Sequence, residues 1–121
     1  MKINGERSVR SVRNEFRERF PFLHIVFLIP AAEAEGEGWK RVGPQKCLCQ
    51  IRNRDVNGNI PLDPLQRPAA LVRTFLEIFD LHVRILRRGA DGWDAVGDDD
   101  DRSLLLHNLM GLKSQDCARI I

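Results

Sequence analysis

One pattern occurs twice in this sequence: an amphipathic helix with two phenylalanines one turn apart leads directly into an apolar strand. The two helix–strand units span about residues 8–29 and 68–87. The matched residues are Phe16, Phe20 and Leu23–Leu28 in the first unit, and Phe75, Phe79 and Leu81–Leu86 in the second. A helix cannot bury an apolar stripe alone, so we expect both helices to pack on one face of a shared sheet. An internal duplication with approximate two-fold symmetry and an ordinary pair of helix–strand units both fit this pattern.

The remaining segments complete a single domain over residues 1–121, a length typical of one domain. Acidic and glycine-rich residues predict an exposed connection over 31–46, and the alternation of Cys47, Cys49 and Ile51 predicts a strand over 47–52. A leucine-rich run predicts a C-terminal helix over about 102–110, with Gly111 as its stop. We therefore predict an α+β fold, in which a mixed sheet of about four or five strands packs against two main helices and a short C-terminal one.

Composition limits the class of protein. The net charge of +2 excludes a protein that is basic throughout, such as a histone-like or ribosomal protein. The longest apolar run, about Leu23 to Ala32, is too short to span a bilayer. The N-terminus lacks the apolar stretch of a signal peptide, and three cysteines are an odd number for a secreted disulfide scaffold. These features indicate a reduced cytoplasmic protein that does not enter a membrane.

Two segments carry a resemblance to a known family. They are Phe16-Arg17-Glu18-Arg19-Phe20-Pro21-Phe22-Leu23, after a Ser-Val-Arg-Ser-Val helix start, and Asp99-Asp100-Asp101-Arg102-Ser103-Leu104-Leu105-Leu106-His107-Asn108, after Trp93 and before Gly111. The chain resembles a family of small uncharacterised bacterial proteins over about residues 7–28 and 68–111. Arg102 and His107 depart from that family's pattern, which has Trp and Gln there. The resemblance implies a shared fold and no activity, because these are packing and capping motifs.

Several residue types raise the question of catalysis or metal binding. Cys47-x-Cys49 has one residue fewer than the usual zinc spacing, and its sulfurs on one strand face indicate core positions. The acidic residues do not follow the EF-hand order, and His24, His82 and His107 have no nucleophile motif near them. We expect no catalytic residue, no metal and no cofactor, and the sequence favours a protein without enzymatic activity.

Charge segregation is the most usable functional signal. Arg10, Arg13 and Arg17 form one stripe of the first helix, opposite its apolar face. The candidate basic surface consists of Arg10, Arg13, Arg17, Arg84, Arg87 and Arg88. The candidate acidic surface consists of Asp91, Asp94, Asp98, Asp99, Asp100 and Asp101. Opposite charges on separate surfaces favour association with a partner, so we expect a protein-interaction module that self-associates or binds another protein.

Two alternatives stay open. A nucleic-acid-binding accessory protein would use the basic surface, and it requires those arginines to converge on one surface of the fold. Aromatic residues are only 7% of the chain, with no tyrosine, which predicts a poor supply of stacking side chains. A small ligand-binding protein or enzyme would have its site near His24 and His82, and it requires one pocket to hold both imidazoles.

Overall fold

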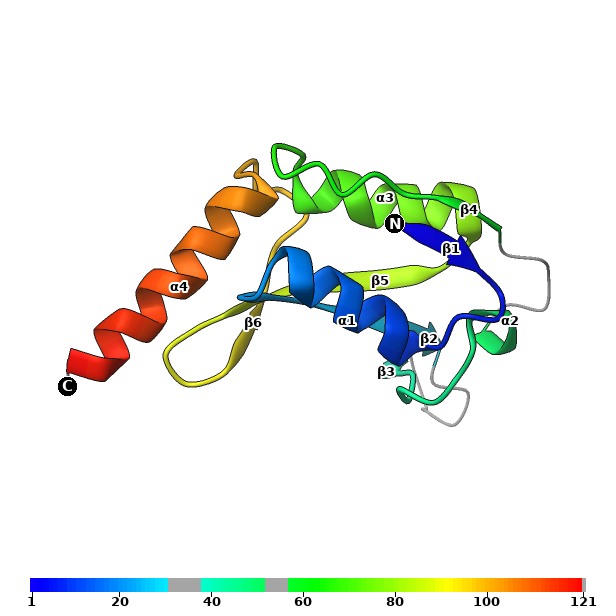
Figure 1. Cartoon of the computed structure of the whole chain (residues 1–121), viewed down its shortest axis with the longest axis horizontal. Coiled ribbons are helices and arrows are strands. Elements are labelled where there is room, and N and C mark those ends of the chain that lie inside the picture. The colour runs from blue at the N-terminus through cyan, green and yellow to red at the C-terminus, as the bar shows by residue number, and fades with distance from the viewer. Residues whose placement is uncertain (31–37, 52–56, 121) are drawn as a thin grey trace.

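The computed structural model describes residues 1–30, 38–51 and 57–120. Figure 1 shows a curved sheet flanked by two long helices, with a third helix leaving the domain at one end. The elements in chain order are β1 (Lys2–Asn4), α1 (Val9–Arg19), β2 (Leu23–Pro30), β3 (Trp39–Arg41), α2 (Leu48–Ile51), β4 (Asn57–Asn59), α3 (Pro68–Phe79), β5 (His82–Arg88), β6 (Trp93–Ala95) and α4 (Leu104–Ile120). The predicted α+β class is confirmed.

The main sheet has the strand order β3-β2-β5-β6, and every neighbouring pair is antiparallel. The expected mixed sheet is therefore wrong. Short connections join β2 to β3 and β5 to β6, and a parallel pair would need a crossover of roughly a dozen residues or more. In the central pair, His24 lies opposite Leu86 and His82 lies opposite Leu28. Each helix–strand unit thus contributes one central strand, and the internal duplication stays a prediction.

The core lies between the sheet and the two helices of the repeated units. Alternate residues of the central strands share one face, and the ring of Phe27 on that face meets Phe75 of α3 edge-on at 5.8 Å. The fully buried residues of α1 are Val9, Val12 and Phe16, and those of α3 include Leu71 and Phe75. Both helices therefore pack on the same face of the sheet, as the apolar stripes predict.

The ends of α1 and α3 follow from local sequence. The Ser8 side chain accepts a hydrogen bond from the Ser11 backbone N–H and caps α1, as expected of serine at this position. Pro68 begins α3, where a missing N–H costs no helical hydrogen bond. Asp80 ends it with φ 53°, the left-handed conformation of a helix C-terminus.

The segment after Lys46 corrects one prediction. Residues 48–51 form the short helix α2 rather than part of a strand over 47–52. The backbone N–H groups of Leu48 and Cys49 donate to the carbonyls of Arg7 and Gly5, and the Gln50 side chain accepts from the Cys47 N–H. These bonds hold the turn against the N-terminal segment, so only Leu48 is buried and Cys49 is exposed.

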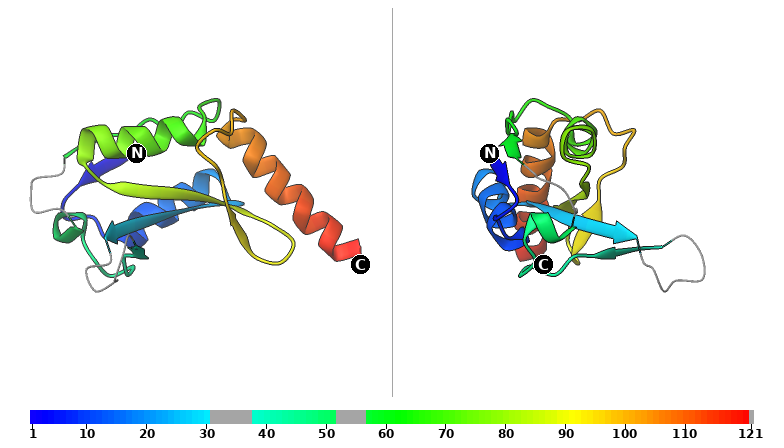
Figure 2. Two further views of the ribbon diagram at one scale, coloured as in Figure 1. Left: turned by 180° about the vertical axis from the view of Figure 1, so that it is seen from behind. Right: turned by 90° about the vertical axis from the view of Figure 1, so that its right-hand side faces the viewer.

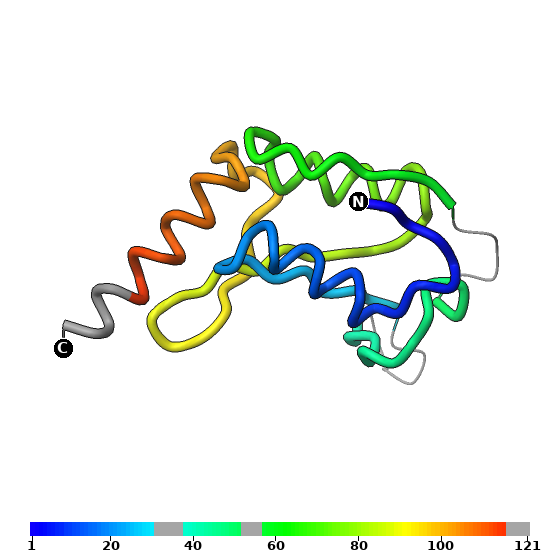
Figure 3. The backbone as a smooth tube through the Cα atoms, viewed as in Figure 1, coloured from blue at the N-terminus to red at the C-terminus, as the bar shows by residue number. Residues whose placement is uncertain are grey.

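Strands also form where none was predicted. The segment expected to be an exposed connection contains β3, which pairs with the end of β2, while residues 31–37 lie outside the described part. The N-terminal strand β1 lies beside β4, as the tube in Figure 3 shows, and the Met1 amine donates to the Ile60 carbonyl at 2.6 Å. Three-residue strands are too short to give a readable alternation.

Helix α4 is longer than the predicted 102–110 and continues through Gly111 to Ile120. Gly111 is not a stop because it is a packing position. A Cβ there would lie 2.6 Å from the Phe22 Cβ, so only glycine permits this approach. Ser103 caps the helix by accepting from the Leu106 N–H, and the helix then runs outward from the domain (Figures 1 and 2).

Candidate anion-binding site

Arg13 and Arg17 lie on the flank of α1, beside a stretch of β2 that pairs with β5 on one edge and with no described strand on the other. Within the described residues, β3 pairs only with Leu28–Pro30, which leaves the first half of β2 with a free edge. Arg13 reaches past this edge and donates from Nη2 to Nε2 of His24 at 3.0 Å. His24 points away from the core, so α1 supplies charged groups to the opposite face of the sheet.

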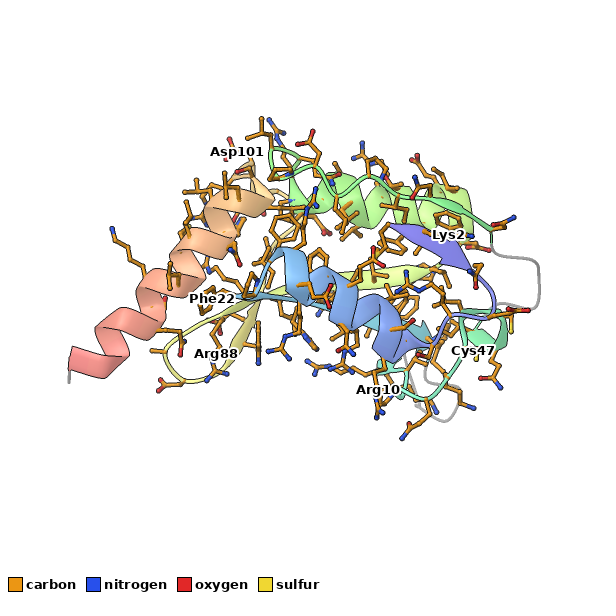
Figure 4. The ribbon with its side chains drawn as sticks, viewed as in Figure 1. Lys2, Arg10, Phe22, Cys47, Arg88 and Asp101 are labelled. Carbon is orange, nitrogen blue, oxygen red and sulfur yellow. The ribbon has the colours of Figure 1, made fainter. Side chains whose placement is uncertain are left out.

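A hollow of about 480 Å³ opens at this place. Four arginines line it, two from α1, one from the end of β3 and one from the end of β5: Arg13, Arg17, Arg41 and Arg88. The other lining residues are Pro21, Phe22, His24, Leu86, Trp93 and Gln115, and none of the described lining residues is acidic. Figure 4 labels Phe22 and Arg88 beside the middle of α4, at the end of α1 remote from Arg10. We call this hollow the arginine pocket.

Trp93 forms an aromatic wall of the arginine pocket. Its ring lies 5.2 Å from the His24 ring, tilted by 40°. The guanidinium carbons of Arg17 and Arg88 lie 5.8 and 5.6 Å from the Trp93 ring centre, which is the range of cation–π attraction. One indole thus orients two of the four arginines.

Among the described residues, no carboxylate forms an ion pair with an arginine of the arginine pocket. Within the described part of the chain, Arg7 pairs with Glu15 and Arg102 with Asp100, whereas no arginine of the pocket forms an ion pair. Burial lowers the pKa of Arg13, and repulsion from Arg17, Arg41 and Arg10 lowers it further. Guanidinium groups held together in this way favour a bound anion, because the anion removes their mutual repulsion.

His24 is a neutral acceptor at the base of the pocket. A guanidinium can only donate, so Nε2 accepts from Arg13 and the ring proton resides on Nδ1. Burial lowers the pKa of His24 to about 4, with further lowering by Arg13, Arg17 and Arg41. Among the described residues, the buried Nδ1 atom has no hydrogen-bond partner. The imidazole therefore positions Arg13 without adding charge at neutral pH.

The structure brings together half of the predicted basic surface. Arg13, Arg17 and Arg88 line the arginine pocket. Arg10 acts on Arg13 through its charge, and Arg84 lies exposed further along the same face of the sheet. Sequence reasoning missed Arg41, because β3 is too short to reveal its pairing with β2.

Arg87 does not belong to the basic surface. It points to the core face of the sheet and donates from Nη1 to Nδ1 of the fully buried His107 at 2.9 Å. His107 Nε2 lies 3.2 Å from Asp100 Oδ1, and Asp100 in turn pairs with Arg102. The pKa of His107 is lowered, because the effect of burial outweighs the nearby Asp100 carboxylate, which raises it. This network fixes the start of α4 against the sheet.

The predicted acidic surface is divided between two places. Asp91 and Asp94 are exposed on the hairpin of β5 and β6, and Asp98, Asp99, Asp100 and Asp101 precede α4. Arg102 holds the pKa of the Asp100 carboxyl well below its usual range. In the described ranges, no group of three or more His, Cys, Asp or Glu side chains is placed to hold a metal ion.

The two strand histidines do not share a pocket. His24 lines the arginine pocket, whereas His82 lines a separate hollow at the other end of the central strands with Trp39 and Arg84. The antiparallel register separates them, because His82 lies opposite Leu28 rather than His24. The geometry required for an enzyme site between both imidazoles is therefore not formed.

Among the described helices, none is both long enough and apolar enough to cross a membrane. Comparison of the chain with family models, with curated proteins and with solved structures finds no match.

Proposed function

We propose that this protein binds nucleic acid and that the arginine pocket is its phosphate-binding site. The observation that carries the proposal is the convergence of Arg13, Arg17, Arg41 and Arg88 on one hollow with no carboxylate among its described lining residues. Arginine suits phosphate because its planar fork offers parallel N–H donors and keeps its charge.

A polymeric anion fits this arrangement better than a single phosphate. The four guanidinium groups come from three elements and surround a hollow of about 480 Å³, which is larger than one phosphate group requires. Arg10 and Arg84 extend the positive charge beyond the pocket on two sides. A chain of phosphates can meet all of these groups in turn, and it gains from counterion release at each of them.

The test is fluorescence anisotropy with a labelled oligonucleotide of about 20 nucleotides over a range of salt concentrations. We expect the double variant Arg17→Ala/Arg88→Ala to bind roughly 10- to 100-fold more weakly, with a salt dependence reduced by about two phosphate contacts. The matched control is Arg67→Ala/Arg73→Ala, which removes the same charge from exposed positions at the start of and on α3. Equal weakening by both pairs, or no binding by the wild type at low salt, contradicts the proposal.

Self-association is a second candidate function, favoured by the outer surface of α4. This helix turns its buried positions, Leu104, His107 and Gly111, toward the domain. Its exposed side carries four leucines, each more than two fifths exposed: Leu105, Leu106, Leu109 and Leu112. Leu105, Leu109 and Leu112 are spaced by four and three residues, the spacing of a coiled-coil seam.

We propose a second copy of this chain as the occupant of that leucine stripe. The stripe is apolar along its length and so complements itself, and α4 projects from the domain, where another α4 can lie along it (Figure 2). Light scattering on a sizing column tests this. Leu109→Glu should convert a salt-resistant dimer to a monomer, and Ile78→Glu, at an exposed apolar position on α3, should leave it intact. A monomeric wild type, or a dimer unaffected by Leu109→Glu, excludes this candidate.

A further inference from the structure

The sheet has a second face, opposite the core, on which aromatic and basic side chains alternate. The register places His24, Val26 and Leu28 of β2 on this face. It also places there the β5 and edge-strand residues His82, Arg84, Leu86, Arg88, Trp39, Arg41 and Trp93. Helices α1 and α3 pack on the other face, and in the view from behind β2 and β5 lie in front of α1 (Figure 2, left). We call this surface the outer sheet face.

Both tryptophans of the protein lie on the outer sheet face, and each contacts a histidine. Trp93 packs on His24 at 5.2 Å, at the arginine pocket. Trp39 packs on His82 at 4.6 Å, and its side chain is 51% exposed. A tryptophan exposed to this extent and held by a second ring offers a flat surface to a ligand. The low aromatic content therefore understates the supply of stacking side chains, because both indoles are gathered on one face.

Arginines lie between and beside the two tryptophan–histidine pairs. His24 and Leu28 are four residues apart on β2, so the pairs are separated by roughly 13 Å along the strand. Arg84 lies opposite Val26, midway between them, and is exposed. Arg88 and Arg41 line the arginine pocket next to the Trp93 pair. The outer sheet face thus presents stacking surfaces at two places, with guanidinium groups between them.

We infer that the outer sheet face binds single-stranded nucleic acid, with phosphates in the arginine pocket and unpaired bases stacked on Trp93 and Trp39. This inference rests on the proposed phosphate-binding function and adds the substrate class. Stacking on a side chain needs a base that is free of its neighbours, which a single strand provides and a regular duplex does not. Arginine planes and indoles accept any base, so the binding has little sequence preference.

The two tryptophans make the inference measurable by intrinsic fluorescence. Trp39→Phe leaves Trp93 as the sole indole, and Trp93→Phe leaves Trp39, so each stacking site reports separately. We expect an oligothymidine to quench the emission of both single-tryptophan variants. An abasic oligonucleotide of the same length, with phosphates but no bases, should leave the emission of Trp39 in the Trp93→Phe variant unchanged. Trp93 is expected to respond to phosphate as well, because Arg17 and Arg88 lie over its ring.

Affinity measurements distinguish base stacking on the outer sheet face from phosphate binding in the arginine pocket. Trp39→Ala removes an exposed ring and should weaken oligothymidine binding roughly 5- to 100-fold, with no effect on the abasic oligonucleotide. Trp39→Phe should restore most of the loss, because phenylalanine also stacks. Wild-type protein should bind oligothymidine more tightly than a duplex of the same length.

Two failures are distinguishable. If binding depends on Arg17 and Arg88 but Trp39→Ala has no effect and the duplex binds equally well, single-strand stacking is wrong and phosphate binding stands. If neither the oligothymidine nor the abasic strand binds at low salt, the phosphate-binding proposal fails together with the inference. Circular dichroism on each variant establishes that the fold is kept.

Discussion

The guanidinium of Arg13 donates to Nε2 of His24 at 3.0 Å, across the free edge of β2. This bond needs a neutral imidazole, because protonation at Nε2 would remove the acceptor. The pair therefore couples the position of a pocket arginine to the protonation state of a residue in the sheet.

The first prediction concerns stability against pH. The pKa of His24 is about 4 in the folded protein and 6.5 in the unfolded chain. Between these values the unfolded chain binds a proton that the folded protein does not. The free energy of unfolding should thus decline as the pH falls from 6.5 to 4, with no further contribution from His24 outside this window. Urea unfolding at several pH values measures the decline, and NMR titration measures the pKa itself.

His24→Gln is the matched variant for this measurement. Its side-chain oxygen can still accept from Arg13, but it does not titrate. The pH dependence of stability should be shallower than in the wild type and should not vanish, since the pKa of His107 is also lowered. An imidazole of His24 that titrates near 6.5 contradicts the assignment of its neutral form.

A second prediction separates two adjacent arginines. Arg87→Met leaves the buried Nδ1 of His107 without its donor and should cost about 1–3 kcal/mol of stability. It should leave oligonucleotide affinity unchanged, because Arg87 faces the core. Arg88→Ala should do the reverse, with lower affinity and nearly unchanged stability. Thermal unfolding and anisotropy on both variants measure this, and loss of affinity in Arg87→Met would falsify the division of roles.

The contrast between these neighbours shows what the sequence can predict. The helical stripes of α1 and α3 predict the core correctly, whereas the expected basic surface grouped Arg87 with Arg88, which the pleat of β5 places on opposite faces of the sheet. Those elements are long enough for their period to be read. The alternation that predicts a strand over 47–52 is misleading, because backbone hydrogen bonds to Gly5 and Arg7 stabilise a helical turn over Leu48–Ile51 instead, while residue 52 lies outside the described part.

The candidate site was only partly predictable for a related reason. The arginine stripe of α1 is a local pattern, and its spacing alone identifies Arg13 and Arg17. Arg41 and Trp39 join the outer sheet face only through the pairing of β3 with β2, which is long-range. The distribution of aromatic residues over the fold likewise cannot be read from their total number.

A third prediction tests the docking of α4. Alanine normally stabilises a helix interior over glycine by about 1 kcal/mol. At Gly111 the added Cβ would lie 2.6 Å from the Phe22 Cβ and 3.1 Å from its carbonyl oxygen. We therefore expect Gly111→Ala to destabilise the protein by about 1–3 kcal/mol despite the gain in helix propensity.

Gly43→Ala is the control, because the nearest atom to its added Cβ is the flexible Gln45 Oε1 at 3.6 Å. Its stability should change by less than about 0.5 kcal/mol. Urea unfolding compares the two variants. Stabilisation by Gly111→Ala would mean that α4 does not lie against Phe22 in solution.

The last prediction links protonation to binding. Arg13, Arg17 and Arg41 contribute to the low pKa of His24, and a phosphate among them would oppose their charge. The pKa of His24 should therefore be higher in the complex than in the free protein, and by linkage affinity must rise as the pH is lowered through these values. Each unit by which the pKa of His24 is higher in the complex than in the free protein corresponds to about a tenfold gain in affinity at a pH below both pKa values. Anisotropy with the oligonucleotide at several pH values between neutral and about 4.5 measures the gain, and circular dichroism at each pH checks that the protein is folded. The His24→Gln variant should lack this gain in affinity at low pH while binding normally at neutral pH. If the pH profiles of the wild type and His24→Gln superimpose, the bound phosphates lie away from His24.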